Sequence, residues 1–164
     1  METELVITRE FNAPKELVFK VWTEAEHLSH WWGPKGSKIT VAEFNFIPGG
    51  RFHYKMDFNN SIMWGLFVYH DINPFDSMSF INSFSDEAGG ITPNPFTVMG
   101  EWPLEVLNKL LLTEADGKTT LTLRGKPINA TPAQVKSFED NLKSMQGGFA
   151  GSFLVLDEYL ASIQ

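Results

Sequence analysis

Apolar residues recur at every third or fourth position from Val135 to Ile163, the spacing of one face of an α-helix. Thr131-Pro132-Ala133-Gln134 stands just before them and has the features of a helix start: a Thr cap, a first-turn Pro and a capping-box Gln. The sequence therefore predicts one long amphipathic helix over residues 131–163, with a single buried stripe. Gly147, Gly148 and Gly151 lie inside it, each costing about 1 kcal/mol relative to Ala. Their presence predicts a close approach of the helix to a sheet or to a ligand.

A region rich in β-strands precedes this helix, because apolar and polar side chains alternate over several stretches. Asn59-Asn60 and Asp116-Gly117 suit tight hairpins, since Asn, Asp and Gly tolerate positive φ. Gly and Pro are frequent over residues 85–103, which predicts a long loop. The predicted strands are residues 5–11, 38–46, 51–58, 62–72, 78–84, 106–113 and 119–124.

Two short helices are predicted between the first two strands. The first begins around Pro14, which is tolerated in the first turn because its missing N–H would have no partner there. The second restarts at Thr23, with Glu26 three residues later in the capping-box position. Gly33-Pro34 ends it.

These elements predict an α+β fold in one domain, residues 1–164: a curved antiparallel sheet with two short helices and one long C-terminal helix. The economical packing places the long helix against the concave side of the sheet. Such a layout commonly leaves a cavity between the helix and the sheet.

Charge and composition limit the classes of partner. The chain has 164 residues, a net charge of −7 and a pI of about 5.0, with no basic run. Nucleic acid and anionic membrane surfaces are therefore not expected partners. The absence of cysteine excludes disulfides and thiolate metal sites. Because the N-terminus lacks a signal-peptide pattern and no apolar run reaches membrane-spanning length, a cytoplasmic location is expected.

Catalytic and metal-binding motifs are weak. His27 and His30 are three residues apart on a predicted helix, but no third ligand is nearby, so solvated histidines are the favoured interpretation. His53 falls on the predicted wet face of its strand, and a His70-Asp71 dyad has no supporting residue. The sequence has no nucleophile elbow, phosphate loop or dinucleotide fingerprint. We therefore expect no catalytic residue, no metal and no cofactor, and an enzyme is the minority interpretation.

Short motifs along the chain carry a family resemblance. They are Phe11-Asn12-Ala13-Pro14, Val18-Phe19, Trp22-Thr23, Leu28, Trp31-Trp32-Gly33-Pro34, Pro48-Gly49-Gly50, Gly65, Pro74, Gly148-Phe149, Leu156 and Leu160. In this order the chain resembles the START-like (SRPBCC) superfamily, which has the helix-grip fold. Within it, the chain resembles the family named for the C-terminal domain of the activator of the ninety-kilodalton heat-shock protein's ATPase. The resemblance runs from about Leu5 to Ile163.

Two positions depart from the family pattern. Members usually carry Trp after the last-helix glycine, where this chain has Phe149, a change that would enlarge or reshape the pocket. Many also carry Asp and Arg before Pro-Gly-Gly, where this chain has Asn45 and Ile47. No charged-site role is therefore transferred to that strand.

Aromatic residues make up 13% of the chain, enough to line a cavity as well as to fill a core. Trp31 and Trp32 cannot both face one way, since adjacent helical residues point about 100° apart. One is expected in the core and the other near the cavity mouth. The candidate ligand-binding residues are Trp31, Trp32, Phe52, Tyr54, Met56, Phe80, Asn82, Phe84, Met145, Phe149 and Phe153.

Three functions remain in competition. The favoured one is non-enzymatic binding of a small hydrophobic or aromatic ligand between the sheet and the C-terminal helix. The resemblance also implies two alternatives, a chaperone ATPase activator and an enzyme like the superfamily's polyketide cyclases and aromatases. The sequence leaves a chaperone partner and a homodimer open.

Overall fold

Seven strands form one antiparallel sheet in the computed structural model of the chain, which describes residues 4–95 and 100–164. Their order across the sheet is β1-β7-β6-β5-β4-β3-β2, so the first strand pairs with the last. The strands are β1 Leu5–Phe11, β2 Lys38–Phe44, β3 Arg51–Phe58, β4 Ser61–Asn73, β5 Ser77–Ser85, β6 Glu105–Ala115 and β7 Lys118–Ile128.

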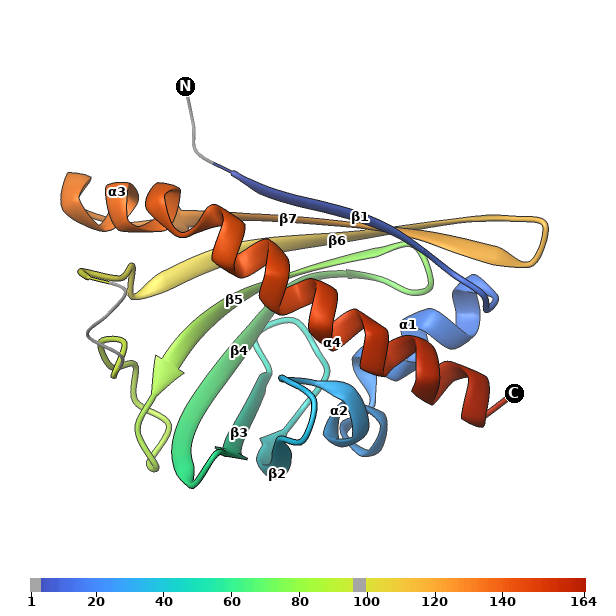
Figure 1. Ribbon diagram of the computed structural model, residues 1–164, viewed down its shortest axis with the longest axis horizontal. Helices are drawn as coiled ribbons and strands as arrows, with labels where there is room; N and C mark the ends of the chain where they lie inside the picture. The colour runs from blue at the N-terminus through green and yellow to red at the C-terminus, as the bar shows by residue number, and fades with distance from the viewer. Residues whose placement is uncertain (1–3, 96–99) are drawn as a thin grey trace.

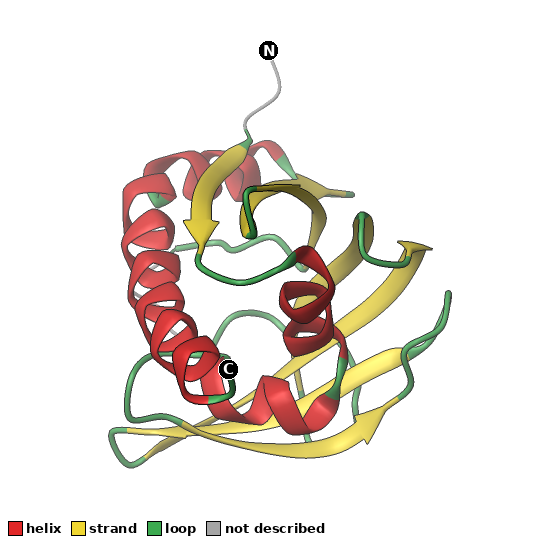
Figure 2. Ribbon diagram, turned by 90° about the vertical axis from the view of Figure 1, so that its right-hand side faces the viewer, coloured by secondary structure: helices red, strands yellow, loops and turns green. Residues whose placement is uncertain are grey.

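Four helices accompany the sheet: α1 Lys15–Thr23, α2 Ala25–Trp31, α3 Pro132–Asp140 and α4 Leu142–Ser162. The long helix α4 runs diagonally across the concave face, and α1 and α2 lie beside its C-terminal half (Figure 1). The view from the side shows the sheet curving around these helices (Figure 2). This is the predicted α+β helix-grip fold.

The core lies between the helices and the concave face of the sheet. Phe11 of β1 and Phe153 of α4 are fully buried and pack edge to face, with ring centroids 5.6 Å apart. Trp22 of α1 contacts Phe153 as well, at 6.1 Å. At the edge of this core, Arg9 and Asp157 form an ion pair at 2.6 Å that joins β1 to α4. The core therefore fixes α4 along its C-terminal half.

Both predicted hairpin turns are confirmed. Asn59 and Asn60 have φ of 52° and 61°, and Asp116 and Gly117 have φ of 54° and 75°. Positive φ at both central residues matches the right-handed twist of the flanking strands. The predicted loop contains an isolated bridge between Ser85 and Ile91, and its residues 96–99 lie outside the described part of the chain.

The prediction of one uninterrupted C-terminal helix is wrong. The capping box is present, because Thr131 Oγ1 accepts from the backbone N–H of Gln134 and the Gln134 side chain accepts from the N–H of Thr131. The helix then breaks at Asn141, whose φ of −108° and ψ of 10° are not helical. The Asn141 side chain donates to the Ser137 carbonyl at 2.7 Å. Asn side chains compete in this way for helical backbone groups, which explains the break between α3 and α4.

The predicted capping box at Thr23 is also wrong. Thr23 is the last residue of α1, and its hydroxyl donates back to the Phe19 carbonyl at 2.8 Å. The cap position of α2 falls one residue later, on Glu24, which makes no side-chain cap hydrogen bond. A local hydrogen bond to the preceding turn therefore occupies the Thr23 hydroxyl.

The helix glycines do not mark a close approach to the sheet. A Cβ built on Gly147, Gly148 or Gly151 would meet no heavy atom within 4 Å. The first alternative, a close approach to the sheet, is therefore not observed. The second, an approach to a ligand, stays a prediction, and Gly148 lines the cavity described below. In the described part of the chain, no helix has both the length and the apolar character needed to cross a membrane.

Candidate functional site

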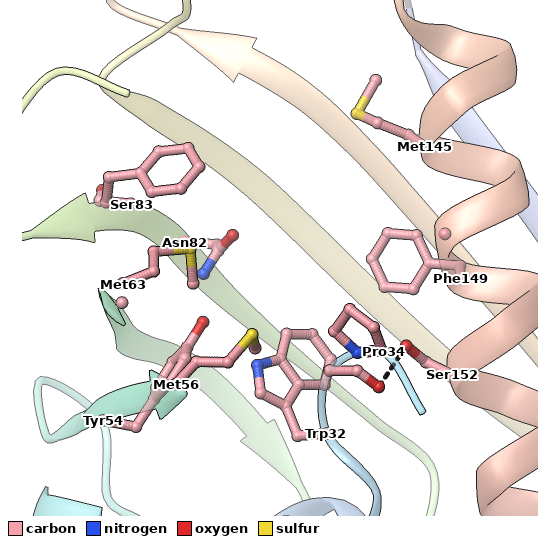
Figure 3. Close-up of a pocket in the computed structure, with 14 residues that line it drawn as sticks. Trp32, Pro34, Tyr54, Met56, Met63, Asn82, Ser83, Met145, Phe149 and Ser152 are labelled. Carbon is pink, nitrogen blue, oxygen red and sulfur yellow. Dashed lines mark hydrogen bonds between the residues drawn. The ribbon is translucent and has the colours of Figure 1, made fainter. Parts of the chain in front are cut away.

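A cavity of about 260 Å³ lies between α4, the turn after α2 and strands β3 to β5 (Figure 3). Side chains from α4 form one wall, and those from the three strands form the opposite wall. The described residues that line it are Trp32, Gly33, Pro34, Tyr54, Met56, Met63, Gly65, Asn82, Ser83, Phe84, Met145, Gly148, Phe149 and Ser152.

Two glycines make room for the cavity wall. A Cβ on Gly65 of β4 would lie 2.3 Å from the ring and hydroxyl of Tyr54, so only glycine lets this ring lie flat across the neighbouring strand. Gly33 has a φ of +97°, and a Cβ there would lie 2.6 Å from the Met56 methyl group. Both glycines therefore fix the positions of cavity-lining side chains.

The structure brings most of the candidate ligand-binding residues together and places the others elsewhere. Those at the cavity are Trp32, Tyr54, Met56, Asn82, Phe84, Met145 and Phe149. Trp31, Phe52 and Phe153 are buried in the core, and Phe80 lines a second, smaller cavity. Phe52 shares a sheet face with Tyr54 but does not line the cavity, because its ring packs against Phe44 and Phe67 in the core.

Sequence reasoning did not name the remaining lining residues as ligand-binding candidates. These are Gly33, Pro34, Met63, Gly65, Ser83, Gly148 and Ser152. Three of them are glycines, which carry no side-chain signal. The inward position of Ser152 follows only from its helical spacing to Phe149, three residues before it, and Leu156, four residues after it.

The adjacent tryptophans have different environments, as their spacing predicts. Trp31 is 1% exposed, and its indole N–H donates to the Val21 carbonyl at 2.9 Å. Trp32 extends into the cavity wall and packs edge to face against Phe67 and Phe149, with centroids 5.1 and 6.2 Å away. Trp31 therefore joins α2 to α1, and Trp32 belongs to the cavity.

Trp32, Tyr54 and Asn82 form one polar corner of an otherwise apolar cavity (Figure 3). Burial raises the pKa of Tyr54, while the neighbouring Trp32 and Asn82 side chains act in the opposite direction. The Asn82 amide also donates to the Leu66 carbonyl at 3.3 Å, which holds its orientation. Because burial is the larger effect, the Tyr54 hydroxyl is protonated at neutral pH.

Charged side chains are absent from the described lining of this cavity. Within residues 4–95 and 100–164, no group of three or more His, Cys, Asp or Glu could hold a metal ion. The described lining therefore offers hydrogen bonds and apolar contacts but no ion pair.

A second cavity of about 70 Å³ lies deeper, toward α3. It shares Trp32, Asn82, Met145 and Phe149 with the larger cavity. Its other described lining residues are Leu5, Phe80, Trp102, Val106, Asn108 and Phe138. The shared side chains thus separate an outer chamber from an inner one.

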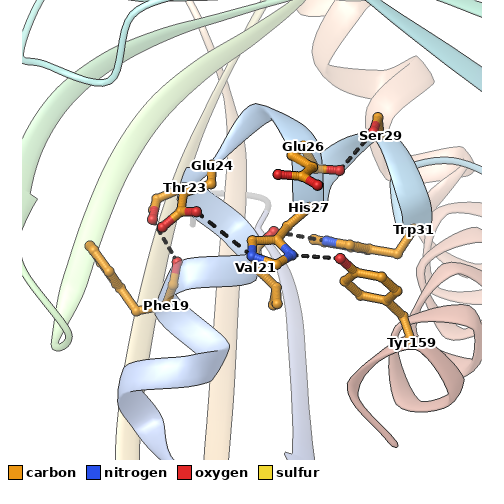
Figure 4. Close-up of polar contacts among 9 residues, drawn as sticks. All are labelled: Phe19, Val21, Thr23, Glu24, Glu26, His27, Ser29, Trp31 and Tyr159. Atoms are coloured by element: carbon orange, nitrogen blue, oxygen red, sulfur yellow. Dashed lines mark hydrogen bonds and ion pairs between the residues drawn. The ribbon is translucent and has the colours of Figure 1, made fainter. Parts of the chain in front are cut away.

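His27 and His30 both contact Tyr159 of α4. His27 is half-buried and lies against the Tyr159 hydroxyl (Figure 4), whereas His30 is exposed, as expected for a solvated histidine. His27 Nδ1 is 2.5 Å from the Tyr159 hydroxyl, and the His30 ring stacks on Tyr159 at 4.9 Å. Burial, followed by the nearby Glu26 and Glu24, raises the pKa of Tyr159. This contact docks α2 on α4 outside the cavity.

His53 is not on a wet face. It is 4% exposed, stacks on Trp64 at 5.0 Å and has Nε2 3.0 Å from the Asp86 carbonyl. The alternation of β3 correctly places His53 on the face of the sheet opposite to that of Tyr54. That face is not solvated here, because Trp64 and the segment after β5 cover His53. By contrast, His70 and Asp71 are exposed at a register shift in β4.

Comparison with known proteins places this geometry in a family. The model of the family described as "Activator of Hsp90 ATPase homolog 1-like protein" matches residues 12–161. No curated protein sequence is significantly similar to this chain.

Solved structures share the fold over nearly the whole chain. Protein Ms6760 of Mycobacterium smegmatis is 26% identical, with a TM-score of 0.76 over 96% of this chain and 90% of its own. A protein from Arthrobacter aurescens is 22% identical, with a TM-score of 0.78 over 97% of this chain and 86% of its own. A protein from Staphylococcus epidermidis is 22% identical, with a TM-score of 0.77 over 100% of this chain and 93% of its own. Together with the match over residues 12–161, the fold and its motifs confirm the resemblance found in the sequence: the chain belongs to the family of activator of Hsp90 ATPase homolog 1-like proteins.

Proposed function

We propose that the protein binds a small, mainly apolar molecule in the cavity between α4 and the sheet, without transforming it. The observation that carries the proposal is the cavity of about 260 Å³, with apolar side chains around most of its surface and a few polar groups at one corner. This combination is typical of sites that hold small apolar ligands, where the few polar groups set the orientation.

The described lining gives little support to the alternative of a cyclase-like enzyme. Acid–base catalysis needs a group that exchanges protons near neutral pH. Tyr54 is the titratable side chain among the described lining residues, and burial raises its pKa away from that range. The cavity thus favours binding over catalysis.

Methionine methyl groups provide a direct test. Met56, Met63 and Met145 line the cavity, whereas Met78 is 2% exposed in the core outside it. With [13C-methyl]methionine, titration with the neutral probe N-phenyl-1-naphthylamine should shift the first three signals and leave that of Met78 unchanged. If the three cavity signals do not move and organic extracts of the purified protein contain no bound compound, the proposal is wrong.

An activator-like role is a second candidate, and the family match over residues 12–161 favours it. It predicts that the protein binds the ninety-kilodalton heat-shock protein and raises its ATPase rate. A titration that detects neither binding nor a change in rate would remove this candidate. The two functions are separable, because ligand binding in the cavity does not require the chaperone.

A further inference from the structure

The polar corner of the cavity contains two side chains with N–H donors, Trp32 and Asn82, on either side of Tyr54. Trp32 contributes an indole N–H, which can only donate. That nitrogen is buried and reaches no acceptor at hydrogen-bonding geometry within the described residues. The amide of Asn82 is oriented with its nitrogen toward the Tyr54 hydroxyl (Figure 3). Tyr54 therefore lies between two donor groups.

This arrangement determines the role of the Tyr54 hydroxyl. The Trp32 and Asn82 side chains act to lower the pKa of Tyr54, as donor groups near its oxygen do, against the larger effect of burial. The Tyr54 oxygen thus lies beside two donor groups. Because the indole N–H of Trp32 can only donate, it cannot accept the hydroxyl proton of Tyr54. Because Tyr54 lines the cavity, a ligand atom held there can accept a hydrogen bond from its hydroxyl group.

Neither Ser152 nor any charged side chain of the described lining provides an alternative anchor for an anion. Ser152 uses its proton for the Gly33 carbonyl at 2.9 Å. Lys, Arg and His are absent from the described lining, so a carboxylate would enter without a counter-charge. Moving an unpaired charge into an apolar site costs far more than moving a neutral carbonyl group.

We propose that the ligand is an uncharged, largely apolar molecule with one oxygen acceptor, such as a ketone, ester or quinone carbonyl, that accepts a hydrogen bond from Tyr54. This inference rests on the proposed function and adds the chemical class of the ligand. The apolar body lies against Met56, Phe84 and Phe149, and the acceptor lies at the polar corner.

Three naphthalene probes of similar shape test the proposal: 2-acetylnaphthalene, 2-isopropylnaphthalene and 2-naphthoate. Calorimetric titration at pH 7.5 should show the ketone binding roughly tenfold more tightly than the hydrocarbon, the effect of about one net hydrogen bond. The carboxylate should bind more weakly than both. Tyr54→Phe should abolish the preference for the ketone over the hydrocarbon.

Tyr69→Phe is the matched control, because Tyr69 is a fully buried tyrosine outside the cavity. It should keep the preference for the ketone, and thermal melting shows whether each variant is folded. Equal wild-type affinities for ketone and hydrocarbon, or tightest binding of 2-naphthoate, would overturn the inference while leaving apolar binding intact. Failure of all three probes to bind would count against the proposed function itself.

Discussion

The hydroxyl of Ser152 donates a hydrogen bond to the carbonyl oxygen of Gly33 across 2.9 Å. The bond joins the middle of α4 to the turn that ends α2, although 119 positions separate the two residues in the sequence. Both residues are buried. Since Trp32 immediately precedes Gly33, this contact sets the distance between Trp32 and α4, and hence the width of the cavity.

Ser152→Ala should therefore weaken both stability and binding. It leaves the buried Gly33 carbonyl without this donor, which costs about 1–3 kcal/mol. Because Trp32 is then less firmly held, affinity for a neutral apolar probe should fall as well. Denaturant unfolding and calorimetry measure the two effects. Ser162→Ala is the control, since its hydroxyl bonds only to the nearby Tyr159 carbonyl; an equal loss in both variants would contradict the role of Ser152.

The two tryptophans should separate stability from binding. Trp31→Ala removes a fully buried ring and its bond to Val21, so unfolding free energy should fall by about 3–5 kcal/mol. Trp32→Phe keeps an aromatic ring on the cavity wall but changes its shape, so ligand affinity should change with a smaller effect on stability. Denaturant unfolding and probe titration of both variants provide the comparison. Equal stability losses without any change in ligand uptake would show that this division is wrong.

Local sequence signals predicted much of this fold because they depend on near neighbours in the chain. The capping box of Thr131 and Gln134 needs only three residues, and the hairpin at Asp116-Gly117 needs only positive φ. The break at Asn141 escaped prediction because its flanking apolar spacing continues without interruption. At this position the Asn141 side chain donates a hydrogen bond to the Ser137 carbonyl, and the helix is interrupted although the apolar spacing continues.

The candidate site was less predictable, because it depends on where α4 crosses the sheet. Alternation places Phe52 and Tyr54 on the same face, yet it cannot show that Phe52 lies in the core and Tyr54 at the cavity. The spacing of Trp31 and Trp32 predicts that they diverge, but only tertiary packing assigns the cavity to Trp32. Gly65 has no side chain to indicate that it accommodates the Tyr54 ring.

Gly148 and Gly147 are a matched pair of exposed helix glycines. Gly148 lines the cavity and Gly147 does not. Gly148→Leu should block the cavity and reduce probe affinity, whereas Gly147→Leu should leave affinity unchanged. Both variants should raise helix stability by up to about 1 kcal/mol, because leucine has a better helix propensity than glycine. Unchanged probe affinity in Gly148→Leu would mean that the ligand binds elsewhere.

Phe149 should limit ligand length, since it helps to separate the outer chamber from the inner one. Phe149→Ala removes part of this division and should shift preference from 2-octanone toward 2-dodecanone in competition with N-phenyl-1-naphthylamine. Phe149→Trp should give the opposite shift. Leu154→Ala, an exposed position on the same helix, is the control. If chain-length preference is the same in all these proteins, Phe149 does not restrict access to the inner chamber.

Buried tyrosines should make the fold sensitive to alkaline pH. Burial raises the pKa of Tyr69, with a smaller contribution from Tyr54, and burial also raises the pKa of Tyr54. Unfolded tyrosine titrates near pH ~10, so below that pH both states hold the proton and stability is constant. Above it the unfolded state loses protons that the folded state retains, and unfolding becomes easier as pH rises.

Denaturant unfolding between pH 8 and 11 should therefore show stability falling above about pH 10, by up to about 1.4 kcal/mol per pH unit for each buried tyrosine. Tyr69→Phe should reduce this slope because it removes one titrating group. At pH 8 the variant should be at least as stable as the wild type, since the Tyr69 hydroxyl is buried without a hydrogen-bond partner among the described residues. Tyr159→Phe, at a more exposed tyrosine, should change the slope less. An unaltered alkaline slope in Tyr69→Phe would show that its hydroxyl already titrates normally in the folded protein.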